Sequence, residues 1–195
     1  MRRGLIIVGL LAGVLAWTSP ADADNRVERQ QDKREIRQDQ ATAEAIETRL
    51  KELEHVVDLW HDANLKDDDN KIRQYESQMR TLIQNDMRET SQQINRQERE
   101  VVRSADEYHR DGHRWSERAD DRRDRNDDRS DVAALRSVLG GKKRVAAGFS
   151  RAVAFSNKYR LVNDYMNLMR QQMGQTQVEL VEDTKELQED SRRLR

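Results

Sequence analysis

Two histidines four residues apart, His109 and His113, form the clearest pattern of metal-ligand type in the sequence. On a helix this spacing places both imidazoles on one face, with Asp106 and Glu117 one turn away on either side. Such a group could chelate zinc, nickel or copper. However, its other donors are exposed carboxylates, Gly112 weakens the helix, and the Glu of a metalloprotease motif is missing. We therefore interpret the histidines as exposed polar residues and expect no metal or other cofactor.

No pattern of catalytic residues is found in the chain. The sequence has no Cys, which excludes thiolate catalysis and Cys-type zinc sites. The run Gly140-Gly141-Lys142 lacks the earlier Gly and the following Ser or Thr of a phosphate-binding loop. Long helical seams also offer no concave pocket of useful size. The sequence therefore predicts that the protein is not an enzyme.

A stretch of unmixed charge is the most unusual feature. The whole chain has 36 basic and 37 acidic residues, yet Val132 to Asn163 contains seven Lys or Arg and no Asp or Glu. Three of these cations, Arg144, Arg151 and Lys158, recur every seven residues and share one helical stripe. The candidate residues for binding an anionic partner are Lys142, Lys143, Arg144, Arg151, Lys158 and Arg160.

Two interpretations of this stripe remain open at the level of sequence. The cations could pair with Glu47 and Glu54 of an earlier helix, as flanking charges do in coiled coils. Alternatively, residues 142–144 would crowd the start of a helix, where anions are favoured, and would bind an anionic envelope polymer or lipid surface. We expect no nucleic acid partner, because the chain has the features of an exported protein.

Three apolar seams predict the elements that would position these residues. The first has Ile46, Leu50, Leu53 and Trp60 among its heptad positions, and the second repeats every eleven residues from Ile72. They predict an antiparallel hairpin over 24–115, with helices at about 26–64 and 68–115 and a reversal around Lys66.

The remainder of the chain is expected to form a charged segment and a third seam. Residues 116–130 are predicted to be either a charged linker or a helix extension. Residues 131–195 are predicted to form a short helix that stops at Gly140-Gly141, followed by one long C-terminal coiled-coil helix from about Val145 to Leu194. The predicted fold class is all-α: an elongated antiparallel hairpin within a three-helix coiled-coil bundle.

The first residues indicate export. Residues 1–23 combine Arg2 and Arg3, an apolar run and a small-residue pattern, as a secretory signal peptide does, and cleavage is expected before Asp24. The alternative, an uncleaved membrane anchor, is less favoured because the apolar run is shorter than the ~20 residues of a spanning helix. A periplasmic or secreted protein is therefore expected.

These observations favour an exported, non-enzymatic coiled-coil protein that acts as a scaffold, an adaptor or a binder of envelope components. Its partner would be a protein or an anionic envelope component, with peripheral membrane contact and self-association as further options. The alternative function is a periplasmic metal-binding, stress-sensing or chaperone-like helical protein.

Overall fold

The computed structural model describes the backbone of residues 20–110 and 115–193, with side chains over 33–103 and 126–185 and at a few further positions. Within these ranges all the regular secondary structure is helical and there is no strand, which confirms the all-α prediction. The helices are α1 (Pro20–Leu65), α2 (Asp69–Arg110), α3 (Trp115–Arg151) and α4 (Phe155–Arg193). The expected three-helix bundle is therefore wrong in its helix number over the described ranges.

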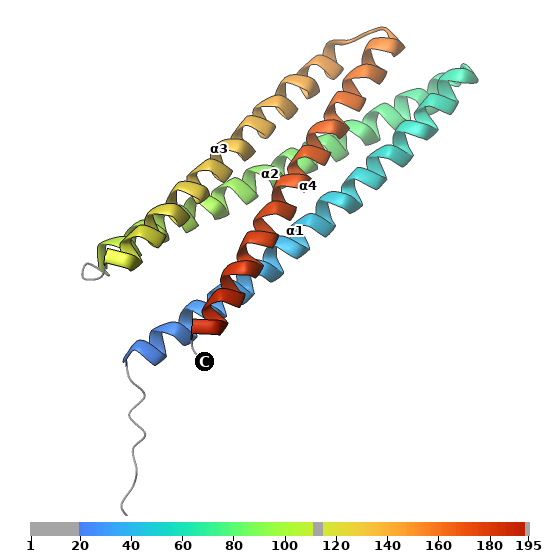
Figure 1. The fold of residues 1–195 in the computed structure, drawn as a ribbon. Coiled ribbons are helices and arrows are strands. Elements are labelled where there is room, and N and C mark those ends of the chain that lie inside the picture. Colours follow the sequence, from blue (N-terminus) through green and yellow to red (C-terminus); the bar gives the residue numbers. More distant parts are fainter. Residues whose placement is uncertain (1–19, 111–114, 194–195) are drawn as a thin grey trace, which may run out of the picture.

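The four helices form an elongated antiparallel bundle (Figure 1). α1 packs against α2 and α4, and α3 packs against the same two helices, so α1 and α3 lie diagonally across the bundle. The α1–α2 and α3–α4 turns lie at one end, which we call the turn end. Toward the opposite end, the α1–α4 pair diverges from the α2–α3 pair (Figure 1). None of the described helices has the apolar length that a transmembrane span needs.

The first reversal lies at residues 66–68, where the sequence places it. Asp67 adopts a left-handed conformation with a φ of 50°, which ends α1 as a C-cap residue does. The next residue starts α2, because the Lys71 amide donates a 3.2 Å hydrogen bond to Asp68 Oδ1. The Asp68 amide also donates to the Ala63 carbonyl at 3.0 Å. The acidic cluster of this turn therefore supplies a helix cap.

Gly140 and Gly141 do not stop a helix, contrary to the sequence prediction, because α3 continues through them to Arg151. Neither has a positive φ. A Cβ at Gly141 would lie 3.2 Å from Leu168 Cδ1, and one at Gly148 would lie 3.3 Å from Leu161 Cδ2. At these two positions glycine thus permits α3 and α4 to approach closely.

The prediction of a single long C-terminal helix is also wrong, because the chain reverses at residues 152–154. The Ala152 amide bonds the Gly148 carbonyl at 2.9 Å as α3 ends, and the Lys158 amide bonds the Ala154 carbonyl at 3.1 Å as α4 begins. The glycine contacts described above are seven residues apart on both helices, as an antiparallel heptad seam requires. The first part of the predicted third seam, on α3, therefore packs against its second part, on α4.

The charged segment 116–130 has a helical backbone within α3.

The apolar core near the turn end contains the predicted first seam. Five of its heptad residues are buried: Ile46, Leu50, Leu53, Val57 and Trp60. Met79 and Ile83 of α2 join most of these residues in one cluster, together with Phe149, Val162, Tyr165, Met166 and Met169. The Trp60 ring lies 4.7 Å from Phe155, between centroids. Met166 and Met169 thus serve as core residues.

The two adjacent glycines provide a matched stability test. Gly140→Ala should raise the free energy of unfolding by about 0.5–1 kcal/mol, because alanine is the better helix former and no atom lies within 4 Å of the new Cβ. Gly141→Ala should gain less or lose stability, because its Cβ meets both Leu168 methyl groups at 3.2 Å. Urea denaturation of each variant measures the difference. Equal gains at both positions would contradict the close α3–α4 contact.

Candidate functional site

Lys142, one of the predicted anion-binding residues, is fully buried. Its Nζ donates hydrogen bonds to Asp86 Oδ2 at 2.6 Å, to Thr90 Oγ1 at 3.1 Å and to Gln172 Oε1. Burial lowers the Lys142 pKa, and the Asp86 carboxylate opposes that shift. Lys142 is therefore a structural residue, and the prediction that it contacts an external anion is wrong.

Asp86 connects all four helices around this lysine. Besides Lys142 of α3, it accepts hydrogen bonds from Arg49 Nε of α1 at 3.2 Å and from the Tyr165 hydroxyl of α4 at 2.8 Å. Burial, followed by the Asp86 charge, raises the Tyr165 pKa and keeps the phenol protonated. Each partner lies on a different helix, so this carboxylate fixes their relative positions.

A chain of buried amides and hydroxyls continues from Gln172 along the bundle. Gln172 Nε2 donates to Gln93 Oε1 at 2.7 Å, and Gln93 Nε2 donates to Thr176 Oγ1 at 3.3 Å. We call the whole network the polar layer: Arg49, Asp86, Thr90, Gln93, Lys142, Tyr165, Gln172 and Thr176. Sequence reasoning missed it, because a polar residue at a seam position does not reveal its partner on another helix.

Lys158 and Arg160 are also matched within the chain. Lys158 Nζ lies 2.5 Å from Glu76 Oε1, and the lysine side chain is only 14% exposed. Arg160 is exposed and pairs with Asp164 at 3.2 Å, one helical turn away. Of these two predicted anion-binding residues, Lys158 therefore serves the α2–α4 contact, and Arg160 is partly neutralised by its neighbour.

The predicted pairing of the basic stripe with Glu47 and Glu54 is wrong. Glu47 pairs with Lys51 on its own helix, at 2.6 Å. Glu54 pairs with Arg170 of α4, at 2.5 Å. α1 packs on α2 and α4, so Arg144 and Arg151 lie on the helix diagonally opposite to these carboxylates, and Lys158 of α4 pairs with Glu76 instead.

Lys143, Arg144 and Arg151 remain exposed on α3. None of them forms an ion pair with any residue that the structure describes. They lie in the last third of α3 rather than at a helix start, so the predicted attraction of anions to a helix N-terminus does not apply. Side-chain charge alone makes this surface attractive to an anion.

Exposed cations on α2 extend this surface. Arg73 and Arg88 are exposed and bond only the neighbouring amides of Asn70 and Asn85 in the described part of the chain. The α2–α3 contacts of Lys142 with Thr90 and of Arg136 with Glu98 set an antiparallel register that brings Arg88 level with Arg144. We define the basic face as Arg73, Arg88, Lys143, Arg144 and Arg151.

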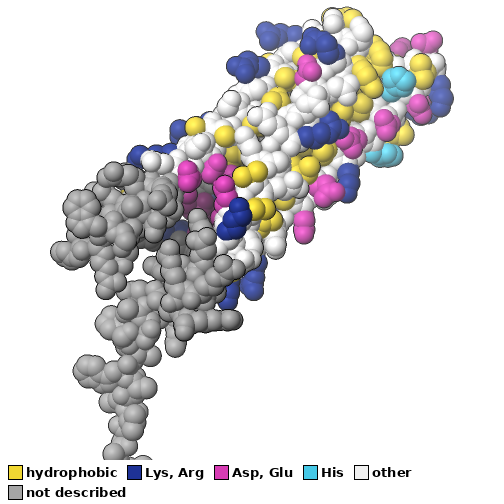
Figure 2. Space-filling model, in the orientation of Figure 1, with side chains coloured by type: hydrophobic (Ala, Val, Ile, Leu, Met, Phe, Trp, Pro, Cys, Tyr) yellow, Lys and Arg dark blue, Asp and Glu magenta, His cyan; other side chains and the backbone are white. Residues whose placement is uncertain are grey.

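Along α2 and α3, no exposed acidic residue lies in sequence between the cations of the basic face, although Asp69 of α2 is exposed one turn before Arg73. Between Asn70 and Arg88 the acidic residues are Glu76 and Asp86, both buried and ion-paired. From Val132 to Arg151, α3 contains none. Figure 2 shows Lys and Arg side chains along the edge formed by α3, whereas most of the acidic side chains visible near the turn end lie over α1. Positive charge therefore collects on the α2–α3 side.

The half of the bundle away from the turn end contains a cluster of partly buried carboxyl groups. One acidic cluster draws on every helix: Asp39, Glu100, Asp131, Glu179 and Asp183. Burial, together with Glu179 and Asp183, raises the Asp39 pKa to about 8. Burial also raises the Glu179 pKa to about 7 and the Asp131 pKa to about 6, with nearby carboxylates adding to both shifts. Each of these carboxyl groups is therefore shifted toward its neutral form.

The remaining predicted site residues, His109 and His113, lie outside the described side chains. Among the described residues no group of three or more acidic or histidine side chains has the arrangement of a metal site. Comparison with known proteins gives no match: no family model fits the chain, and no curated protein or solved structure is detectably similar. Functional inference therefore rests on the chain's own surface.

The acidic cluster predicts that stability falls as pH rises. The folded-state pKa of Asp39 lies above its ordinary value of 3.8, so full stability is present below about pH 4 and is lost as pH rises through about 8. The free energy of unfolding should therefore drop by at least about 1 kcal/mol between pH 5 and 8.5, since one pKa unit corresponds to 1.36 kcal/mol.

Asp39→Asn removes this titrating group and should flatten the profile. Urea denaturation of both proteins across that pH range gives the comparison. Parallel profiles for the two proteins would show that Asp39 is not part of a strained cluster.

Proposed function

We propose that the protein is an exported, non-enzymatic helical-bundle protein that binds an anionic component of the bacterial envelope. One observation carries the proposal: the basic face presents five exposed cations on α2 and α3 without an exposed carboxylate between them. Every acidic residue within those spans of α2 and α3 is buried and ion-paired. Such a surface attracts phosphate-bearing or carboxylate-bearing polymers and anionic lipid.

The different roles of the cations within the acid-free stretch support this interpretation. Lys142 and Lys158 come from the same acid-free stretch but are used in buried contacts with α2. Lys143, Arg144 and Arg151 have no comparable role in the described structure. A scaffold or adaptor could hold an envelope component on this face and leave the opposite face, with its mixed charges, free for other contacts.

A non-enzymatic role agrees with how the reactive side chains are used. Lys142 and Tyr165 are buried groups that could transfer protons, but both are hydrogen-bonded to Asp86. Burial raises the Tyr165 pKa above its ordinary value, and burial lowers the Lys142 pKa while the Asp86 carboxylate opposes that shift. They support the fold instead of facing a substrate.

A chaperone-like role is the second candidate, because apolar side chains are exposed at the turn end. Val153 is 92% exposed, Leu65 is 71% exposed, and Tyr159 near the start of α4 is partly exposed. Apolar side chains gathered at one end of a helical bundle could contact unfolded clients. The basic face has more members and a defined charge, so the anion-binding role is preferred.

Sedimentation with vesicles and with purified cell wall tests the proposed function. The chain from Asp24 onward should bind one of these anionic preparations at low salt, and binding should fall steeply as salt is raised, because exposed charges are screened within about 8 Å at physiological salt. The variant Lys143→Gln, Arg144→Gln, Arg151→Gln should bind roughly 100-fold more weakly, at about 1 kcal/mol per cation.

A matched control removes the same charge elsewhere. Lys51, Arg160 and Arg170 are exposed and ion-paired on α1 and α4, so changing all three to Gln should leave binding nearly intact. Absence of wild-type binding to either preparation, or equal loss in the two triple variants, would refute a specific role for the basic face.

A further inference from the structure

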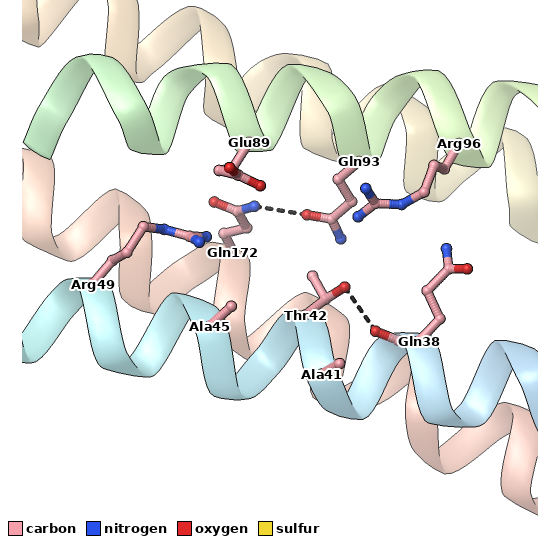
Figure 3. Close-up of a pocket in the computed structure, with 9 residues that line it drawn as sticks. All are labelled: Gln38, Ala41, Thr42, Ala45, Arg49, Glu89, Gln93, Arg96 and Gln172. Carbon is pink, nitrogen blue, oxygen red and sulfur yellow. Dashed lines mark hydrogen bonds between the residues drawn. The ribbon is translucent and has the colours of Figure 1, made fainter.

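A cavity of about 370 Å³ lies between α1 and α2, beside the polar layer (Figure 3). α4 contributes Gln172. The lining from α1 consists of Gln38, Ala41, Thr42, Ala45 and Arg49, and the lining from α2 consists of Glu89, Gln93 and Arg96. The volume is at the small end of the range for ligand pockets.

Small side chains on α1 account for this cavity. Ala41 and Ala45 lie one turn apart on the wall formed by α1. Nearer the turn end, Leu53 and Val57 of the same helix fill the bundle interior. Small side chains therefore leave space where the helix pairs begin to diverge (Figure 1).

Polar side chains line the cavity together with apolar atoms, which supply the larger part of its surface. Seven of its nine residues have polar or charged side chains. The amides of Gln93 and Gln172 are fixed by their mutual 2.7 Å hydrogen bond. A ligand would therefore meet hydrogen-bonding groups that are already positioned.

Two guanidinium groups approach the cavity from opposite ends (Figure 3). Arg49 is oriented by its Nε contact with Asp86, which leaves its terminal nitrogens available. Arg96 makes no ion pair with the described residues, and its Nε is buried without a hydrogen-bond partner. A buried guanidinium donor without an acceptor favours a bound carboxylate.

The charged residues around the cavity indicate that a complementary ligand would carry more than one charged group. Among the described lining residues, Arg49 and Arg96 supply two cations and Glu89 supplies one carboxylate. Glu100 lies outside the described lining, one turn beyond Arg96, and is within electrostatic range of that arginine. Asp86 behind Arg49 is shared with Lys142, so it does not cancel the arginine charge alone. Two carboxylates and one ammonium group on a ligand would complement this set.

We propose that the cavity between α1 and α2 binds a small dicarboxylate that carries an ammonium group, an acidic amino acid. Its two carboxylates would contact Arg49 and Arg96, and its ammonium group would contact Glu89. The cavity is separate from the basic face, so the proposal stands independently of the envelope-binding function.

Thermal unfolding of the full-length chain with L-glutamate tests this site. At 10 mM, L-glutamate should raise Tm by at least about 3 °C relative to sodium chloride of equal ionic strength, because it binds only the folded state. Glutarate, which lacks the ammonium group, should raise it less. No rise with L-glutamate, or the same rise with chloride or glutarate, would overturn the proposal.

Three variants locate the binding. Arg96→Gln should weaken glutamate affinity at least 10-fold in calorimetry, and Ala45→Leu should fill the cavity and abolish binding. Arg88→Gln, on the basic face, should leave affinity unchanged. Circular dichroism checks folding, and Arg96→Gln decides the outcome if Ala45→Leu does not fold. Unchanged affinity in Arg96→Gln, or equal loss in Arg88→Gln, would place binding elsewhere.

Discussion

The buried ion pair between Lys142 and Asp86 is the interaction on which the rest of the bundle depends. Removing two charges from water is costly, and the cost is offset only when geometry and further hydrogen bonds are favourable. Here Arg49, Tyr165 and Thr90 supply those bonds from the neighbouring helices. A helix shifted by one turn would leave a buried charge without its partner. The pair therefore favours one register of four long helices whose apolar seams alone would tolerate several.

The buried ion pair is one of several contacts that leave some charged side chains inside the bundle and others on its surface. Lys142 and Lys158 are used within the bundle, and the two carboxylates that lie between the α2 cations of the basic face are used with them. The cations of the basic face form no ion pair with a described residue, whereas a cluster of partly buried carboxylates lies between the helices toward the other end. A chain that is nearly neutral as a whole thus presents one basic face. The proposed envelope binding rests on that face.

Much of the fold could be predicted from helical periodicity. Leu53 and Trp60 are buried at their predicted seam positions, and the chain reverses close to Lys66 as predicted, with Asp68 capping α2. The reversal at 152–154 could not be predicted, because it contains neither Gly nor Pro and the heptad spacing from Gly148 to Phe155 continues across it. Gly140 and Gly141 were misinterpreted for a related reason. In the sequence alone, a glycine that allows two helices to approach closely cannot be distinguished from a glycine that ends a helix.

The site could be predicted only in part, because exposure depends on partners distant in sequence. Lys142 and Lys143 are adjacent and chemically alike. However, Lys142 is buried and pairs with Asp86, 56 residues earlier, whereas Lys143 is exposed to solvent. The cavity lining was missed as well, since Arg49 and Arg96 meet only through the α1–α2 register. Of the six candidate residues in the basic stretch, Lys142, Lys158 and Arg160 form ion pairs within the chain, and Lys143, Arg144 and Arg151 are exposed.

A double-mutant cycle at Lys142 and Asp86, followed by urea denaturation, tests the central claim most directly. Lys142→Met and Asp86→Asn should each lower the free energy of unfolding by about 3–5 kcal/mol, because each leaves a buried group without its partner. The double variant should lose clearly less than the sum of the two. Lys143→Met should change stability by no more than about 0.5 kcal/mol, as a surface substitution does. Small, additive effects at Lys142 and Asp86, or an equal loss at Lys143, would contradict the account.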